Sequence, residues 1–297
     1  MSPYLIRTLC WVCRSWRSFR GRWWLMRRLH SWQGSMSRVG EVRVWVNSIW
    51  SWMVLNPADF VDRYLFIEGE YEGSNLAFLK SVCKPGATVV DIGANIGVFT
   101  LAASQSVGPS GAVFAFEPAP GIFHRLSRNI ALNRDASRGN ITLINKAVGD
   151  CEGEVPFYES TDGNSGLSSM RDIGSSCKEP VRVPVAVLDS MLDSLPSVAL
   201  VKMDIEGAEM KALRGMRALI ERDKPVLMIE LSDAFLREMG SSAKDLCGLV
   251  KGWGYVVYRR NGNGELKEVM SAPVEQCDVI CLHKGNGVPR APGAGNS

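Results

Sequence analysis

The sequence predicts an α/β protein built on an open, doubly wound, mostly parallel sheet. Two observations predict this fold class. From about residue 84 to residue 260, apolar β-branched runs alternate with segments of helical spacing, as they do where crossover helices connect parallel strands. The first of these strands runs directly into a glycine turn and a helix start, in ATVVDIGANIGVFT (Ala87 to Thr100). A strand, turn and helix in this order form the cofactor-binding end of such a sheet.

The expected elements follow in a regular order. Val42–Leu55 has apolar residues at helical spacing and predicts an amphipathic helix that packs on the domain. A further helix ends near Leu79, before the breaker Lys84-Pro85-Gly86. Ser160–Pro180, rich in Ser and Gly, is too long for a simple connection and is compatible with a lid or with a disordered segment. Later helices are expected at 96–107, 121–133, 208–221 and 243–252, and strands at 112–117, 141–145, 154–158, 181–187, 198–204, 226–230, 255–259 and 278–283.

The glycine turn after the first strand suits a nucleoside with a positively charged tail. Gly93 and Gly97 allow a tight turn close to a ligand, and Asn95 between them tolerates a left-handed backbone. Asp91, at the strand end, suits a cationic group better than a pyrophosphate. Glu117 closes the next strand, where a carboxylate accepts hydrogen bonds from ribose hydroxyls. The third glycine of a dinucleotide-binding G-x-G-x-x-G is missing, which disfavours a dehydrogenase.

Six blocks in this order make the chain resemble the FkbM family of S-adenosylmethionine-dependent methyltransferases. The resemblance covers about Glu68 to Glu230, and the wider class-I methyltransferase fold extends to about His283. It implies a seven-stranded Rossmann-like sheet with one antiparallel strand, 278–283, inserted near its end, and the chain adds an N-terminal helical extension. The blocks are GEYEG (69–73), VVDIGANIGVFT (89–100), FEPAP (116–120), NKAVGD (145–150), KMDIEGAE (202–209) and IEL (229–231).

The resemblance also implies which residues hold S-adenosylmethionine. In the family, the block that contains Tyr71 and Glu72 closes over the methionine end of the cofactor. The block that contains Ala147 and Val148 is expected to line the adenine. The expected cofactor site therefore consists of Tyr71, Glu72, Asp91, Gly93, Asn95, Gly97, Glu117, Ala147 and Val148.

Asp91, Glu117, Asp204 and Glu230 each end a predicted strand, so we expect these carboxylates to meet at one edge of the sheet. The first two serve the cofactor, which leaves Asp204 and Glu230, with Glu206 in the adjoining turn, to face a methyl acceptor. We expect Asp204 to act as general base toward a hydroxyl, with its pKa raised by acidic neighbours. The same oxygens are compatible with Mg²⁺, which the resemblance does not require. Capping of the next helix, or a solvated strand end, would explain these residues without catalysis.

Basic residues are concentrated at the N-terminus. Residues 1–40 hold eight Arg and no Lys, Asp or Glu, whereas the rest of the chain has 26 basic and 31 acidic side chains. The catalytic part is therefore acidic, which gives no support for a nucleic-acid-binding groove. Eight of the nine Trp precede Asn56 and interleave with these arginines. This pattern is typical of an anionic lipid interface, and it is also compatible with a disordered extension, a targeting segment or a later start at Met26 or Met36.

These observations divide the chain into a basic leader with the amphipathic helix (1–55), a catalytic domain (56–284) and a flexible tail (285–297). No run of about 18 apolar residues predicts a transmembrane helix. The eight scattered Cys favour a reducing compartment and no zinc site. We therefore expect a cytoplasmic enzyme, held peripherally at a membrane if the leader is an anchor.

The expected reaction is methylation of a hydroxyl on a sugar, glycan, lipid-linked saccharide or secondary metabolite. The alternative is a nucleoside-binding or scaffold protein that has kept the fold and lost turnover. No motif in the sequence specifies the acceptor or the oligomeric state.

Overall fold

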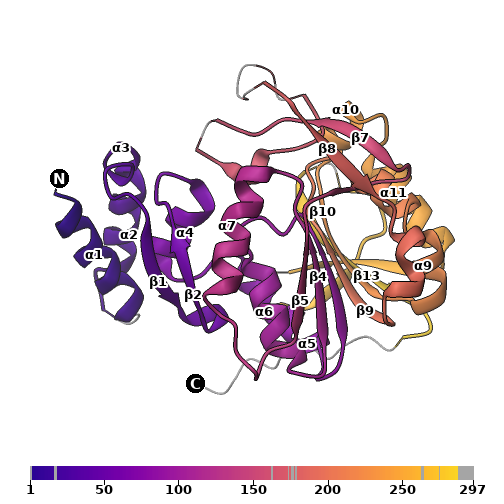
Figure 1. The fold of residues 1–297 in the computed structure, drawn as a ribbon, viewed down its shortest axis with the longest axis horizontal. Coiled ribbons are helices and arrows are strands. Elements are labelled where there is room, and N and C mark those ends of the chain that lie inside the picture. Colours follow the sequence, from indigo (N-terminus) through magenta and orange to yellow (C-terminus); the bar gives the residue numbers. More distant parts are fainter. Residues whose placement is uncertain are drawn as a thin grey trace.

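The computed structural model describes residues 2–16, 19–161, 163–172, 174, 177, 179–261, 264–273 and 275–286. Its centre is an eight-stranded sheet with the order β12-β11-β13-β10-β9-β3-β4-β5 (Figure 1). The predicted doubly wound α/β fold is confirmed. The strands of this sheet are β3 (Thr88–Ile92), β4 (Ala112–Phe116), β5 (Asn140–Ile144), β9 (Val198–Met203), β10 (Val226–Leu231), β11 (Tyr255–Arg260), β12 (Leu266–Glu268) and β13 (Cys277–His283).

Parallel pairing brings the carboxyl ends of five neighbouring strands to one edge. β5, β4, β3, β9 and β10 are all parallel. β13 pairs antiparallel with both β10 and β11, which confirms the inserted antiparallel strand. The predicted number of seven strands is wrong, because β12 adds a second antiparallel strand at the edge, next to β11. With only three residues, β12 is too short to show the alternation that predicts a strand.

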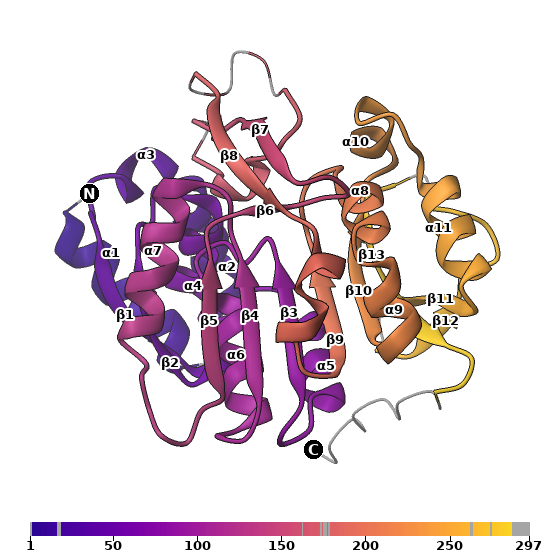
Figure 2. The ribbon, with the colours of Figure 1, turned by 45° about the vertical axis from the view of Figure 1, so that its right-hand side comes forward.

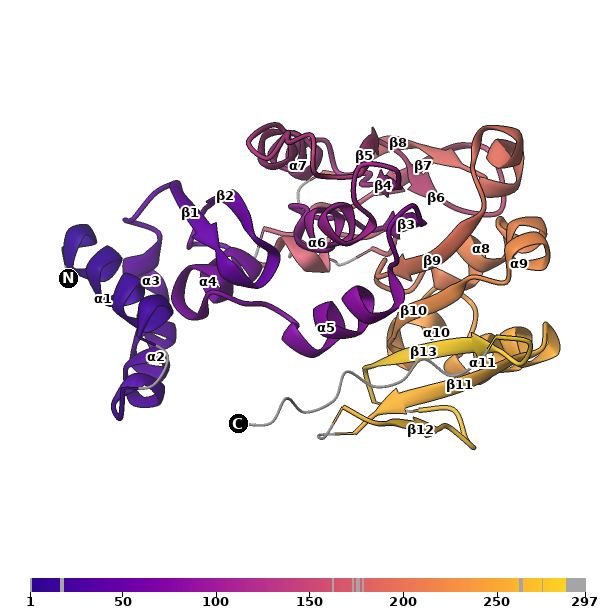
Figure 3. The same ribbon diagram turned by 90° about the horizontal axis from the view of Figure 1, so that it is seen from below.

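Helices cover both faces of the sheet (Figure 3). α5 (Gly73–Val82), α6 (Val98–Val107) and α7 (Pro120–Ala131) bury their apolar residues in one core. α8 (Glu209–Arg214), α9 (Arg217–Asp223), α10 (Asp233–Glu238) and α11 (Ala243–Gly252) contribute to a second core on the other face. Burial from both sides explains why β3 is inaccessible along its whole length and reads as an apolar run.

The single helix predicted at 208–221 is wrong, because the chain breaks between α8 and α9. At Gly215 the backbone packs so closely on another loop that an added Cβ would lie 1.8 Å from the Gly149 carbonyl oxygen. Helix α9 then begins, and a side chain caps its first turn. The Asp189 carboxylate accepts hydrogen bonds from the backbone N–H groups of Ala218 and Leu219, both at 2.9 Å.

A smaller sheet stands above the carboxyl ends of the central strands (Figure 2). It has the order β6-β8-β7 and consists of β6 (Ala147–Val148), β7 (Gly153–Phe157) and β8 (Val181–Ala186). The strands predicted at 154–158 and 181–187 are therefore confirmed to within one residue. A short 3-10 helix, η2 (Ser165–Leu167), lies in the connection between β7 and β8. From residue 287 onward, the predicted tail lies outside the described residues.

The amphipathic helix predicted at Val42–Leu55 is wrong. This segment is a hairpin of β1 (Val42–Val46) and β2 (Ser51–Leu55), joined by the turn η1 (Asn47–Ile49). Both strands alternate between buried and accessible residues, which the helical spacing of the combined segment conceals. The outer edge of β2 is paired by side chains: Asn133, just after α7, and Asn129, within α7, accept hydrogen bonds from the N–H groups of Trp52 and Val54 at 2.8 Å.

The leader is folded wherever the structure describes it, so a disordered extension is ruled out for those residues. Its helices are α1 (Pro3–Ser15), α2 (Arg22–Ser31) and α3 (Gln33–Met36), and the first two pack against α4 (Phe60–Glu68). Ile6 and Leu29 are completely buried there. The Arg22 side chain donates hydrogen bonds to the Cys13 and Glu68 carbonyl oxygens, which ties α2 to both neighbours.

Cys10 and Cys13 are buried on α1 as free thiols, and burial raises the pKa of Cys10 to about 12. In the part of the chain that the structure describes, no cysteine belongs to a metal-binding cluster. Among the described helices, none is long and apolar enough to cross a bilayer.

Core substitution on α1 tests whether the leader is part of the fold. We expect Ile6→Ala to lower the free energy of unfolding by about 2 to 5 kcal/mol, because it leaves a cavity between α1 and α4. Trp11→Ala on the same helix, where the indole is exposed, should change it by less than about 0.5 kcal/mol. Denaturant unfolding measures both values. Equal, negligible effects of the two substitutions would show that the leader does not pack as described.

Candidate active site

The loop between β3 and α6 brings the ends of β3 and β9 into contact. Gly93 has φ +80°, and a Cβ at this position would lie 1.9 Å from the Asp204 carbonyl oxygen. Gly97 has φ +97°, and its Cβ would lie 2.8 Å from a methyl carbon of Leu126. Asn95 has φ +48°, the left-handed backbone that the sequence predicts. Only glycine fits at residue 93, and this close approach fixes Asp204 beside the turn.

Glu117 lies beside this turn, directly after β4. Its two carboxylate oxygens accept hydrogen bonds from the backbone N–H groups of Asn95 (2.9 Å) and Ala119 (3.0 Å). Burial raises its pKa to about 7, although these two hydrogen bonds oppose the rise. Each oxygen keeps a lone pair that a ligand hydroxyl can use.

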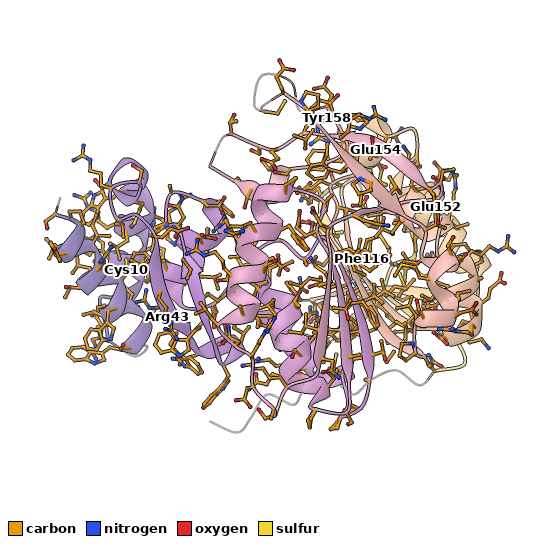
Figure 4. All side chains as sticks on the ribbon, viewed as in Figure 1. Cys10, Arg43, Phe116, Glu152, Glu154 and Tyr158 are labelled. Carbon is orange, nitrogen blue, oxygen red and sulfur yellow. The ribbon has the colours of Figure 1, made fainter. Side chains whose placement is uncertain are left out.

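A cavity of about 580 Å³ opens over Glu117. Its walls are largely apolar and come from the end of β4, from β6 and from the connection between β7 and β8. Figure 4 shows Phe116 at the end of β4, below the smaller sheet that carries Glu154. The apolar lining residues are Ile92, Phe116, Ile122, Ala147, Val148, Phe157, Met170 and Ile205.

A second cavity of about 840 Å³ adjoins the first and is strongly acidic. The two cavities share Gly93, Asn95, Gly166 and Asp204 as lining residues. The charged residues of the second cavity are Glu72, Lys202, Asp204, Glu206 and Glu230.

Lys202 is the buried cation of this second cavity. Its ammonium lies 3.2 Å from Asp204 Oδ2 and 3.3 Å from the Gly93 carbonyl oxygen, and 5.0 Å from the centre of the Phe99 ring. Burial alone would lower its pKa, but the negative charges of Asp204, Asp91 and Glu72 raise it instead. Lys202 therefore stays protonated and neutralises part of the carboxylate charge.

Asp91 is not placed where we expected it. Its side chain is buried and accepts a hydrogen bond from Thr100 Oγ1 at 2.6 Å. Burial raises the pKa of Asp91, and the positive charge of Lys202 opposes this rise. Asp91 lines neither cavity. Its position indicates that it orients Lys202 and the start of α6, rather than contacting a ligand.

Asp204, Glu206 and Glu230 do converge, with one carboxylate oxygen of each within 4.8 Å of the others. Burial would raise the pKa of Asp204, but attraction to Lys202 and a hydrogen bond from Glu230 lower it. The expectation of a raised pKa at Asp204 is therefore wrong. Its neighbours carry the raised values instead: burial and the charge of Asp204 raise the pKa of Glu206 to about 8 and also raise that of Glu230.

These values describe a site in which Asp204 is ionised and Glu230 holds a proton that it donates to Asp204. Gln276 Nε2 donates to the other side of Glu230 at 2.8 Å. Three carboxylates are a ligand set that Mg²⁺ accepts. In this structure, Asp204 instead contacts the ammonium group of Lys202 and accepts a hydrogen bond from Glu230.

Tyr71 and Glu72 reach the second cavity from the segment before α5, as the resemblance implies. Glu72 accepts a hydrogen bond from Asn75 Nδ2 at 2.9 Å, and burial raises its pKa. Its φ is +49°, and that of Glu206 is +55°. Together with Asn95, three of the five non-glycine residues with positive φ in the described part of the chain line this cavity. Such strained backbone concentrates at functional sites.

The segment 164–170 closes over both cavities, which fits the lid interpretation of Ser160–Pro180. Gly166 lines both, and Asn164 and Leu167 face the acidic cavity. Asp59 at the start of α4 anchors this segment by accepting a hydrogen bond from the Ser165 N–H at 2.8 Å. Sequence reasoning missed several lining residues that belong to no motif: Phe60, Val61, Phe157, Met170 and Gln276.

Substitution of Gly93 tests the close packing on which the site depends. Gly93→Ala should lower the free energy of unfolding by about 2 kcal/mol or more, because it combines backbone overlap with a left-handed φ. Gly34→Ala is the matched control, since nothing lies within 4 Å of its added Cβ, and it should be neutral or slightly stabilising. Thermal and denaturant unfolding report both. A Gly93→Ala protein as stable as the wild type would contradict this geometry.

Comparison with known proteins identifies the catalytic part of the chain. Residues 91–257 match the family model described as the methyltransferase FkbM domain. Methyltransferase 1 of Beauveria bassiana is 30% identical over 183 residues, which cover 54% of this chain and 70% of that protein. The 31-O-demethyl-FK506 methyltransferase FkbM of Streptomyces tacrolimicus is 24% identical over 203 residues, 59% of this chain and 74% of that protein.

Two further matches are more distant or shorter. The hexuronic acid methyltransferase AglP of Haloferax volcanii is 29% identical over 128 residues, 42% of this chain and 48% of that protein. A crystal structure of a methyltransferase FkbM from Methylobacillus flagellatus aligns with a TM-score of 0.42 and 18% identity, covering 86% of this chain and 59% of that chain. On the match of the family model to more than half of its length, the chain belongs to the FkbM family of methyltransferases.

Proposed function

We propose that the protein transfers a methyl group from S-adenosylmethionine to a hydroxyl of a sugar, glycan, lipid-linked saccharide or secondary metabolite. The observation that carries this proposal is the pair of adjoining cavities, which meet at Gly93, Asn95, Gly166 and Asp204. Apart from the shared Asp204, the first has a largely apolar lining with Glu117 as its carboxylate, and the second has three further carboxyl groups. S-adenosylmethionine has the same division between a nucleoside and a cationic amino-acid end.

The apolar cavity suits the nucleoside end. Ala147 and Val148 on β6, with Phe116 and Ile122, offer flat apolar walls for an adenine ring. Glu117 stands at the cavity with both oxygens fixed by backbone N–H groups, and its free lone pairs suit the two ribose hydroxyls. An oriented acceptor of this kind loses little entropy when a ligand binds.

The acidic cavity suits the methionine end. Its one cation, Lys202, is already paired with Asp204, and the four carboxyl groups of this cavity offer oxygen acceptors for the ammonium group of the cofactor. A pyrophosphate needs hydrogen-bond donors and positive charge instead, so this lining favours S-adenosylmethionine over NAD. Tyr71 and Glu72 border this cavity, in agreement with the role that the family resemblance assigns to them.

Asp204 is the proposed base because of its position. It lines both cavities, and 29% of its side chain stays accessible, so an acceptor hydroxyl can reach it at the junction. The cofactor would supply a methyl group on a sulfonium sulfur, which leaves as a neutral thioether when the acceptor oxygen bonds to the methyl carbon. Asp204 aligns the hydroxyl and takes its proton, while Lys202 and Glu230 hold the carboxylate in place.

The acceptor class rests on the polar character of the second cavity and on the relatives. One relative is named for a hexuronic acid and another for a demethylated FK506, so hydroxylated sugars and macrolide-like metabolites are suitable first acceptors to test. A scaffold protein without turnover is the alternative. An ionised Asp204 at the junction favours the enzyme, since a binding protein needs no base there.

Glu117 provides the test of the cofactor. Glu117→Gln should weaken S-adenosylmethionine binding by about 1 to 3 kcal/mol, because an amide replaces an acceptor of two ribose hydroxyls. Glu152→Gln, at an exposed residue before β7, is the matched control and should bind as the wild type does. Isothermal titration calorimetry measures the affinities, and melting temperatures check the fold. Binding of NAD as tight as that of S-adenosylmethionine would overturn the assignment.

Asp204→Asn tests the base. Its kcat should fall by about 10² or more while the cofactor Kd changes only a few fold. Because the pKa of Asp204 is lowered, wild-type kcat should be flat between about pH 6 and 7.5.

A kcat that instead rises with its midpoint near pH 8, with activity lost in Glu206→Gln, would assign the base to Glu206, whose pKa is raised to about 8. Activity that is lost with a chelator and restored by Mg²⁺ would replace the general-base mechanism by a metal-assisted one.

A further inference from the structure

The exposed large hydrophobic side chains of this protein are concentrated in one region. Of the 11 such residues in the described part of the chain, nine lie between Tyr4 and Trp52, and the other two are Val181 and Met270. Single exposed apolar residues are ordinary, but a group of them marks an interaction surface. We call this group the aromatic surface: Tyr4, Leu5, Trp11, Trp16, Trp23, Trp24, Trp45, Trp50 and Trp52.

Three of its indoles form a compact cluster on the hairpin. Trp45 lies 5.4 Å from Trp52 and 6.1 Å from Trp50 between ring centres, in edge-to-face arrangements. Both strands bury their other face, with Val46 and Met53 completely inaccessible. The core therefore does not require these tryptophans. A hairpin with one face in water normally carries polar residues at such positions.

The N-terminal helices carry the other members of the aromatic surface. On α1, Ile6 and Cys10 face the core, while Tyr4 and Trp11 are 81% and 54% exposed. Trp23 and Trp24 open α2 and are both exposed by about two thirds. In Figure 1 the start of α2 and the turn between β1 and β2 lie toward the same, lower end of the N-terminal region.

Arginine side chains surround these aromatic rings without acidic partners. Arg20, Arg27, Arg28, Arg38 and Arg43 are exposed, and none of them pairs with an acid among the residues that the structure describes. Arg27 lies 4.6 Å from the centre of the Trp23 ring, and Arg43 lies 4.6 Å from that of Trp52. These arginines differ from Arg14 and Arg22, whose guanidinium groups bind backbone carbonyls inside the fold.

The charge of this region is almost entirely of one sign. Residues 1–55 contain nine Arg and a single acid, Glu41. Glu41 is already paired with Arg128 of α7 at 3.0 Å. The free arginines therefore present an uncompensated positive field beside exposed indoles.

We propose that the aromatic surface and its free arginines dock the protein on an anionic phospholipid bilayer. Indole rings bury their apolar body at the level of the lipid head groups, and guanidinium groups pair with lipid phosphates at the same depth. The charge complementarity selects an anionic bilayer over a neutral one. Since none of the described helices can span a bilayer, this contact is peripheral.

The hairpin part of the aromatic surface lies at the other end of the central strands from the cavities. Trp45, Trp50 and Trp52 border a groove formed with the connection between α7 and β5, and Arg138 of that connection donates to the Trp50 carbonyl oxygen. That connection precedes β5, so it lies at the amino ends of the central strands, whereas both cavities open at the carboxyl ends. A protein docked through the hairpin thus turns its cavities toward the aqueous side. Under the proposed function, the acceptor hydroxyl then arrives from water or on a long head group.

Vesicle binding by the full-length protein tests the docking, and it requires neither cofactor nor acceptor. The wild type should sediment with vesicles that contain phosphatidylglycerol, stay in solution with phosphatidylcholine alone, and be released by about 0.5 M NaCl. Arg27→Glu/Arg28→Glu should lower the partition coefficient at least about tenfold. Lys244→Glu/Lys267→Glu makes the same charge change at exposed residues elsewhere and should bind as the wild type does.

A second pair of variants tests the contribution of the hairpin tryptophans. Trp45→Ser/Trp50→Ser/Trp52→Ser should also lose at least about tenfold in partitioning, whereas Met270→Ser, at an exposed residue outside the aromatic surface, should not. Melting temperatures verify that the variants fold.

Quenching by brominated lipids keeps the test valid even if the hairpin variant does not fold. Because eight of the nine Trp lie before Asn56, wild-type fluorescence should be quenched by brominated phosphatidylglycerol vesicles.

Three results would overturn the proposal. These are no sedimentation with anionic vesicles at low salt, equal binding by the Arg27/Arg28 variant and its control, and binding without quenching. A concentration-dependent dimer that buries the tryptophans, or salt-sensitive RNA binding without vesicle binding, would assign the surface to a different partner. None of these results bears on S-adenosylmethionine binding, so the two proposals fail separately.

Discussion

A buried ammonium group organises the functional edge of this protein. Lys202 projects from β9 toward Asp91 and Glu72 and pairs with Asp204 at 3.2 Å. A buried carboxylate without such a cation would cost several kcal/mol. Lys202 therefore allows several acids to converge where parallel strands end, and it decides how their protons are distributed. Asp204, in contact with Lys202, keeps its charge, and Glu230 and Glu206, in the field of that charge, hold their protons more tightly.

The central sheet and most of the rim were predictable because their signals are local. The glycines define the conformation of the turn after β3. Parallel strands bring their carboxyl ends to one edge of the sheet, so the sequence is enough to place Glu117, Asp204 and Glu230 at that edge. The proton distribution was not predictable, since it depends on which of several neighbours lies closest to Asp204. The hydrogen bond from Thr100 to Asp91 was not predictable either, because no spacing in the sequence reveals it.

The N-terminal region shows a different limit. The apolar residues of Val42–Leu55 fit a helix when read together, but each half fits a strand. The choice is made by partners about 80 residues away, because Asn129 of α7 and Asn133, just after this helix, accept hydrogen bonds from the hairpin backbone. The same local reading left open whether the leader was ordered. Its burial against α4 depends in part on arginine contacts with backbone carbonyls, which have no periodic signal.

Hydrogen exchange with and without S-adenosylmethionine tests most directly the claim that the two cavities around Lys202 and Asp204 form one cofactor site. Bound cofactor should slow exchange in the turn 93–97, at Ala119, in β6 and in the segment 164–170, because these backbone groups line the cavities or hold Glu117. Residues 1–55 should exchange at an unchanged rate. Unchanged exchange at 93–97 and β6 under saturating cofactor, or protection confined to the N-terminal region, would contradict the account.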